Sequence, residues 1–142
     1  GKELGYLPGE VDEKIDPYFR PIKETLKLIL GDINYRGLWD KVEFMPINFV
    51  RGTTFHKSYI LVDEAQHFTP KELKVIGTRG GDNSKLILTG DPFQIDNAYL
   101  DEKSNGLTVL TDRFRGKLPE FAYVILYRVE RGRVAEVFAN YL

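Results

Sequence analysis

Apolar residues in this chain gather in three short runs that lie between stretches of mixed polarity. The runs are residues 59–62 (YILV), residues 86–88 (LIL) and residues 122–129 (AYVILYRV). Each run is too short for a typical helix and does not alternate between apolar and polar positions. Such runs are typical of strands that are buried on both faces of a parallel sheet. The pattern therefore predicts three buried strands.

The stretches around these runs show helical spacing. Residues 15–32 place apolar side chains three or four positions apart, with Asp16 as the expected cap and Gly31 as the expected end. Residues 69–79 begin with Thr69, Pro70 and Glu72, the arrangement of a capping box. Further helices are predicted over residues 105–116 and 134–142, with a short helical piece over 35–41. Residues 42–50 read as extended and 51–57 as a loop.

Strands and helices thus alternate along the chain, which predicts an α/β fold with a parallel sheet and helices on both faces. With 142 residues, the chain is expected to form a single domain over residues 1–142. In sheets of this kind, ligands bind at the carboxyl ends of the strands. Side chains that follow the strands directly are therefore the first candidates for a functional site.

Composition narrows the classes of function. The formal net charge is −1, so no general attraction to nucleic acid or to an anionic membrane is expected. There is no cysteine, which excludes a disulfide scaffold, a zinc–thiolate site and a cysteine nucleophile. No apolar run approaches the roughly 20 residues of a membrane-spanning helix. These features favour a cytoplasmic protein without membrane contact, and the opening GKELGYLPG is interpreted as the start of a trimmed fragment.

Polar side chains follow the first two predicted strands. Asp63 and Glu64 come directly after residues 59–62, and Thr89, Asp91 and Gln94 follow residues 86–88. One carboxylate that orients hydrated Mg²⁺ and one group that positions the attacking water are what a nucleotide-hydrolysing site needs. Each strand end alone could equally be a helix cap or an ordinary turn. Two such ends about 25 residues apart, with a helix between them, favour the functional interpretation.

The sequence resembles the PhoH family of P-loop ATPases and, more distantly, the core of superfamily-one helicases. The resemblance rests on DEAQ followed by LTGDPFQID, on LGYLPGEVDEKIDPYFRPI, on FVRGTTF and on YLDEKSNGLTVLTDRFRG. It covers nearly the whole chain and is greatest with the branch that is fused to an N-terminal PIN nuclease domain. Proteins of that branch are described as RNA helicase–ribonucleases. The resemblance implies part of a P-loop NTPase domain of the RecA-like or helicase-like kind, with ATP and Mg²⁺ as cofactors.

It also implies roles for individual residues at the strand ends. Asp63 matches the Walker B residue that holds magnesium, and Glu64 matches the catalytic base. Gln94, in GDPFQ, would sense the γ-phosphate, with Thr89 and Asp91 beside it.

Two arginines complete the implied site. Arg51, in VRGTTF, is expected to contact nucleotide or RNA. Arg131 matches an arginine finger that reaches into the site of the neighbouring subunit in a ring, and this ring is hexameric in the family. The implied partners are therefore RNA, further copies of the chain and an upstream P-loop or PIN segment. The chain departs from the family pattern at His67, where Asn is usual, and at Thr53, where the family often has a second arginine.

The P-loop signature G-x-x-x-x-G-K-[ST] does not occur in the 142 residues. We therefore expect the phosphate-binding half of the site to lie upstream. The chain alone is expected to hydrolyse no ATP at a useful rate, and to form an active ATPase only together with that half. Without the strand that carries the P-loop, the sheet would expose an apolar edge. We expect this edge to self-associate or to be covered by the N-terminal segment. Two alternatives remain open: a catalytically inactive module that binds RNA or other copies, and a divalent-metal nuclease that uses Asp63, Glu64, Asp91 and Asp96.

Overall fold

The computed structural model describes residues 11–127 and 132–141 of the chain. Its contacts divide into two compact units, Gly1–Met45 and Pro46–Leu142. No helix within the described residues is both long and apolar enough to cross a membrane.

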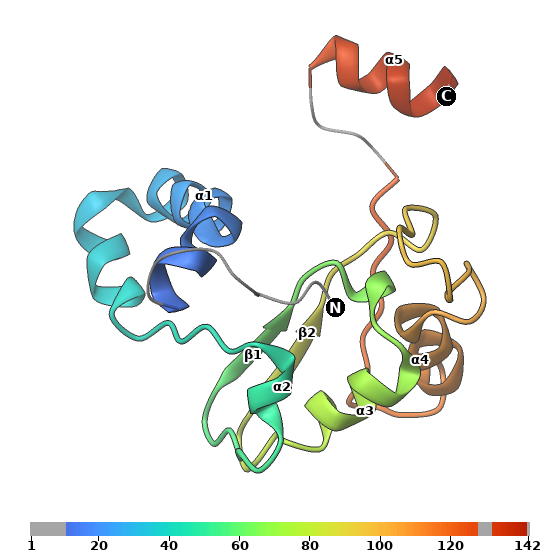
Figure 1. Cartoon of the computed structure of the whole chain (residues 1–142), viewed down its shortest axis with the longest axis horizontal. Coiled ribbons are helices and arrows are strands. Elements are labelled where there is room, and N and C mark those ends of the chain that lie inside the picture. The colour runs from blue at the N-terminus through green and yellow to red at the C-terminus, as the bar shows by residue number, and fades with distance from the viewer. Residues whose placement is uncertain (1–10, 128–131, 142) are drawn as a thin grey trace. The chain divides into compact units, whose positions relative to one another are not determined.

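The first unit is built on one long helical element, α1 (Val11–Trp39), which is interrupted at Gly31 (Figure 1). Gly31 has φ 72° and ψ 159°, a conformation that only glycine adopts readily. The break therefore falls where the sequence predicts the end of a helix, and the predicted helical piece near residue 35 continues the element to Trp39. The predicted start is wrong, because the helix begins at Val11 and Asp16 lies inside it instead of capping it.

Aromatic side chains form the packing of this first unit. The rings of Phe19 and Phe44 stack with centroids 3.5 Å apart, and Trp39 lies 5.6 Å from Tyr35 and 5.2 Å from Phe44. The ammonium group of Lys23 lies over the Trp39 ring, 5.1 Å from its centroid. These rings therefore pack against one another within the unit.

The second unit contains a two-stranded parallel sheet made of β1 (Tyr59–Val62) and β2 (Lys85–Leu88). The strands pair in register from Tyr59 opposite Lys85 to Val62 opposite Leu88. Both strands are confirmed where the sequence predicts them. The third predicted strand is wrong over residues 122–127, which form no regular structure, and residues 128–129 lie outside the described residues.

The two faces of this sheet differ in exposure. Ile60, Val62, Leu86 and Leu88 alternate with more exposed neighbours and form the covered face. On the other face, Tyr59 is 78% exposed, Leu61 56% and Ile87 38%. The prediction of strands buried on both faces is therefore wrong.

Helices α3 (Pro70–Gly77) and α4 (Gly106–Phe114) lie together on one side of the sheet (Figure 1). Thr69 and Glu72 form the predicted capping box at the start of α3, and Asn105 caps α4. The core beneath them contains Leu73 and Ile76 of α3 together with Val62.

Three further short elements complete the described residues. A 3₁₀ turn, η1 (Ala65–His67), follows β1 directly. The helix α2 (Ile47–Val50) replaces part of the extended segment that the sequence predicts over 42–50. The terminal helix α5 (Arg133–Tyr141) is confirmed where the sequence predicts one.

Candidate functional site at the carboxyl ends of the two strands

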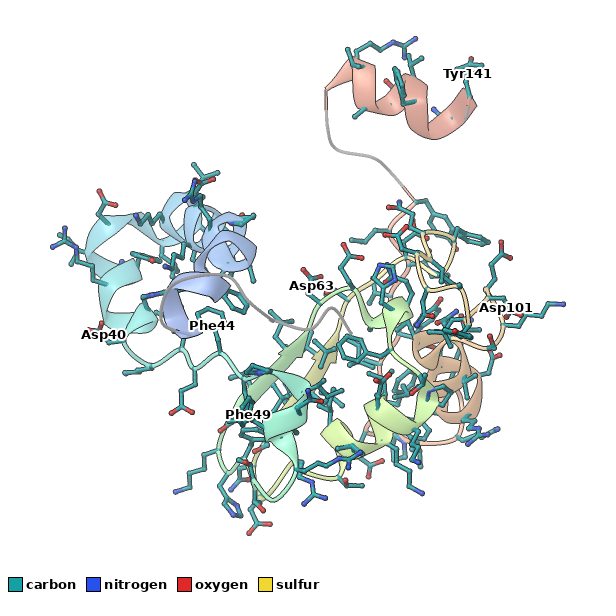
Figure 2. The ribbon with its side chains drawn as sticks, viewed as in Figure 1. Asp40, Phe44, Phe49, Asp63, Asp101 and Tyr141 are labelled. Atoms are coloured by element: carbon teal, nitrogen blue, oxygen red, sulfur yellow. The ribbon has the colours of Figure 1, made fainter. Side chains whose placement is uncertain are left out.

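The two parallel strands end at the same edge of the sheet, and their backbones stay joined just beyond it. The Thr89 N–H donates to the Val62 carbonyl at 3.0 Å, and the Ala65 N–H donates to the Thr89 carbonyl at 2.8 Å. Asp63, labelled in Figure 2 at the end of β1, follows the first strand directly. The predicted strand-end residues therefore come to one place, as a parallel register requires.

Asp63 and Thr89 are in direct contact. The Thr89 hydroxyl donates to Oδ1 of Asp63 at 2.6 Å, and the Glu64 N–H donates to the same oxygen at 3.0 Å. Both side chains are exposed. The two bonds share Oδ1 and hold the carboxylate of Asp63 in place at the edge of the sheet.

Glu64 has a left-handed backbone conformation, with φ 53° and ψ 43°. For a residue other than glycine this conformation costs about 1–2 kcal/mol. It turns the chain sharply from β1 into η1, so the side chains of Asp63 and Glu64 no longer alternate as they would on a strand. Two adjacent carboxylates can therefore serve the same site.

The loop after β2 is organised by Asp91. Its Oδ1 accepts from the Phe93 N–H at 3.0 Å, and its Oδ2 accepts from Nε2 of Gln94 at 2.9 Å. The Gln94 N–H also donates to the Asp91 carbonyl at 3.1 Å. Asp91 thus holds the Gln94 side chain in a defined position beside the strand ends.

Gln66 makes hydrogen bonds to residues of both loops. No functional role for it was predicted from the sequence. It is fully buried, with 0% exposure. Its Nε2 donates to Oε2 of Glu64 at 2.6 Å and to the Gln94 carbonyl at 3.0 Å, and its Oε1 accepts from the Asp91 N–H at 3.1 Å. The signal available in the sequence was an amide within DEAQ, directly after a strand end.

Gly90 leaves the space that Gln66 occupies. A Cβ atom at position 90 would collide with Oε1 of Gln66 and would lie 3.0 Å from the Ala65 nitrogen and 3.1 Å from a methyl carbon of Leu107. A side chain at position 90 would therefore displace the buried amide that connects the loops.

The other candidate residues do not join this cluster. Arg51 follows α2 as an exposed residue, and among the described residues it makes no hydrogen bond or ion pair with the strand-end side chains. Arg131 lies outside the described residues. Asp96 is exposed, and within the described ranges no group of three or more acidic or histidine side chains is placed to hold a metal ion.

Asp63 and Thr89 fit a magnesium ion that is bound mainly through water and substrate. Mg²⁺ usually keeps several water ligands and is held by one or two carboxylates together with substrate phosphates. Asp63 offers one oriented carboxylate and Thr89 one hydroxyl at this edge of the sheet. A full protein cage is not needed for such a site, so the small number of ligands agrees with magnesium.

Comparison with known proteins identifies the class of protein to which this arrangement belongs. The model of the PhoH-like protein family matches residues 1–140, and the chain belongs to this family.

Individual relatives agree with the family match. Protein PhoH2 of Bacillus subtilis is 37% identical over 149 residues, which cover all of this chain and 33% of that protein. A PhoH-like protein of the same organism is 43% identical over 118 residues, covering 82% of this chain and 36% of that protein. Protein PhoH2 of Mycolicibacterium smegmatis is 33% identical over 147 residues, covering the whole chain and 32% of that protein. The chain therefore spans about a third of the length of these relatives.

Proposed function

We propose that this chain supplies the magnesium-holding, water-activating and phosphate-sensing part of an ATP-hydrolysing site. The observation that carries the proposal is the meeting of Asp63, Glu64, Thr89, Asp91 and Gln94 at the carboxyl ends of two parallel strands. Membership of the PhoH-like family, whose members are generally ATP-binding proteins, supports the choice of nucleotide.

Each side chain has a role that its contacts allow. Asp63, fixed by Thr89, would hold the hydrated magnesium ion that neutralises charge on the phosphates. Glu64 is exposed beside it and would take a proton from the attacking water through its Oε1, the oxygen that Gln66 does not hold. Gln94, oriented by Asp91, would donate its side-chain amide to the γ-phosphate or to the water.

The rest of the site would come from elsewhere. The chain has no P-loop signature, so an anion-binding loop with its lysine must be added for the phosphates to be held. Arg131 would act as an arginine finger toward a neighbouring copy in a ring, and Arg51 would contact nucleotide or RNA. We propose RNA as the associated nucleic acid and place the protein in the cytoplasm.

The two alternative functions receive less support. A catalytically inactive module that binds RNA or other copies of the chain would not need the exposed carboxylate pair, with one oxygen of each fixed by a hydrogen bond. A metal nuclease would need several carboxylates around one or two ions, and the described residues hold no such group. No observation favours either alternative over nucleotide hydrolysis.

The proposal is tested by Mg²⁺-dependent ATP hydrolysis in a protein that joins this chain to a P-loop segment, with the chain alone as the comparison. We expect turnover only in the joined protein, and a loss of about 10²–10⁴-fold in kcat in Glu64→Gln. ATP affinity, measured by calorimetry, should change much less. Asp112→Asn, which removes an exposed acid on α4, is the control. Equal turnover in Glu64→Gln and the control would overturn the proposal.

A further inference from the structure

We propose that Gln66 is a positioning residue that mechanically links the Glu64 carboxylate to the loop carrying Gln94. The inference rests on the proposed function for its catalytic consequence, although the link itself can be tested without hydrolysis. A movement of Gln94 on gain or loss of a phosphate would then reorient Glu64.

Gln66 uses all of its hydrogen-bonding groups within the protein. One N–H is donated to Oε2 of Glu64, the other to the Gln94 carbonyl, and the oxygen accepts from the Asp91 N–H. Because the side chain is 0% exposed, water cannot replace a bond that breaks. An unpaired buried polar group costs about 1–3 kcal/mol. Movement of one loop without the other would break at least one of these bonds and carry this cost.

Gln66 also orients the Glu64 carboxylate. The bond from Gln66 to Glu64 is 2.6 Å long and joins an N–H to a charged acceptor, which makes it one of the stronger bonds of the site. It fixes one oxygen of a side chain that is otherwise exposed. The buried amide of Gln66 therefore also sets the direction of the second carboxylate oxygen of Glu64, which would contact the attacking water.

Asn105, a second fully buried amide among the described residues, differs from Gln66 in where its partners lie along the chain. Asn105 is also 0% exposed and its Nδ2 makes three bonds, but its partners Asp101, Glu102 and Thr108 lie within four residues along the chain. Asn105 therefore stabilises a single helix cap. Gln66 has partners 25 and 28 residues away and bridges two separate loops.

The link is tested on the 142-residue chain by nuclear magnetic resonance. Glu64→Gln removes the charge at one end, and the backbone amide signals of Asp91 and Gln94 report at the other end. We expect the substitution to shift both signals in the otherwise unchanged chain and in Asn105→Asp. In a Gln66→Met background, which keeps the size but not the bonds, the response should fall to less than about a quarter. An undiminished response would overturn the link, because it would show transmission through space.

Gln66→Leu provides a second background should Gln66→Met fail to give a folded spectrum. It removes both donors of the amide and the oxygen that accepts from the Asp91 N–H, and it adds no acidic group that could itself bond to the side chain at position 64. A response to Glu64→Gln that persists in Gln66→Leu would also overturn the link.

The catalytic consequence is measured in the protein joined to a P-loop segment. Gln66→Met should lower kcat about 10–100-fold with ATP affinity changed less than about threefold, while Asn105→Leu, which likewise removes every hydrogen bond of a fully buried amide, should leave kcat near its original value. Equal kcat losses in the two variants would reduce Gln66 to a stabilising residue and overturn the positioning role. If the joined protein hydrolyses no ATP, the proposed function fails, and the amide signals still decide whether Gln66 links the loops.

Discussion

The side chains of Asp63 and Glu64 illustrate how single residues divide a task. On a regular strand, neighbouring side chains point to opposite faces, so one of the two acids would leave the site. The strand ends at Val62, and the left-handed conformation of Glu64 turns the next residue into η1. Asp63 accepts a hydrogen bond from Thr89, which follows β2, whereas Glu64 accepts one from the buried amide of Gln66. The two acids are therefore oriented independently.

Thr89 is expected to matter through Asp63 and not through substrate. Thr89→Val keeps the shape but removes the hydroxyl that fixes the carboxylate at 2.6 Å. A residue that orients a metal ligand typically changes affinity or activity about 10–100-fold. In the protein joined to a P-loop segment, the Mg²⁺ concentration for half-maximal ATP hydrolysis should rise by about that factor. Thr78→Val is the matched control, because this exposed hydroxyl bonds only the Val75 carbonyl in α3. Identical Mg²⁺ dependence in the two variants would exclude this role.

Asp101 predicts a pH dependence of stability. Hydrogen bonds from the backbone of Ser104 and Lys103 and from the Ser104 hydroxyl lower the pKa of Asp101 below its ordinary value of 3.8. Because the pKa is lowered in the folded state, the stabilisation is fully present above 3.8 and is lost as pH falls through the folded value. Asp101→Asn should therefore lower the melting temperature near neutral pH, and the difference should shrink below pH 3.8. Thermal melts of both proteins across this range measure it; a constant difference would contradict the expectation.

At the scale of elements, local signals predicted what local interactions determine. Thr69 and Glu72 mark the start of α3 because both partners of the capping box lie within one turn. The apolar runs at β1 and β2 predicted two strands, and these strands pair with each other in the structure. Residues 122–127 have a similar apolar run but pair with neither strand of the sheet, and a strand exists only through bonds to a neighbour. That property cannot be read from the run itself.

The candidate site shows the same division. The carboxylates and Gln94 could be predicted because their residue types follow the strands directly. Gln66 could not, because its role depends on bonds to residues 25 and 28 positions away and on its complete burial. Arg51 was assigned through resemblance alone, and its contacts within the described residues do not connect it to the cluster.

The junction between α4 and the turn before α3 gives a prediction at this scale. The Gly106 N–H donates to the Phe68 carbonyl at 2.7 Å, and a Cβ at position 106 would lie 2.7 Å from that oxygen and 2.9 Å from the Thr69 carbonyl. Backbone atoms cannot move aside cheaply, so Gly106→Ala should destabilise the protein by about 1–3 kcal/mol. Gly77→Ala is the control, since its nearest neighbour would be a Leu86 methyl carbon at 3.8 Å. Urea unfolding measures both, and equal stability would contradict the packing argument.

At the scale of the whole chain, several apolar surfaces are exposed among the described residues, and two of them lie on regular elements of the second unit. One is the open face of the sheet, formed by Tyr59, Leu61 and Ile87. The other is a stripe on α5 formed by Val134, Val137, Phe138 and Tyr141, spaced at three and four positions. Apolar surface exposed to water favours association roughly in proportion to its area. Both surfaces therefore predispose the chain to bind apolar partners, including other copies of itself.

The open face of the sheet predicts concentration-dependent self-association of the 142-residue chain. Replacing both Leu61 and Ile87 with Thr keeps good strand-forming residues but makes the face more polar, so association should weaken several-fold while β1 and β2 persist. Sedimentation velocity over a hundredfold concentration range measures the change, and Tyr99→Thr, which removes an aromatic side chain 94% exposed in a loop, is the control. Phe138→Ser tests the α5 stripe separately. If the unchanged chain sediments as a monomer throughout, the sheet face does not drive association; if only Phe138→Ser weakens it, the contact belongs to α5.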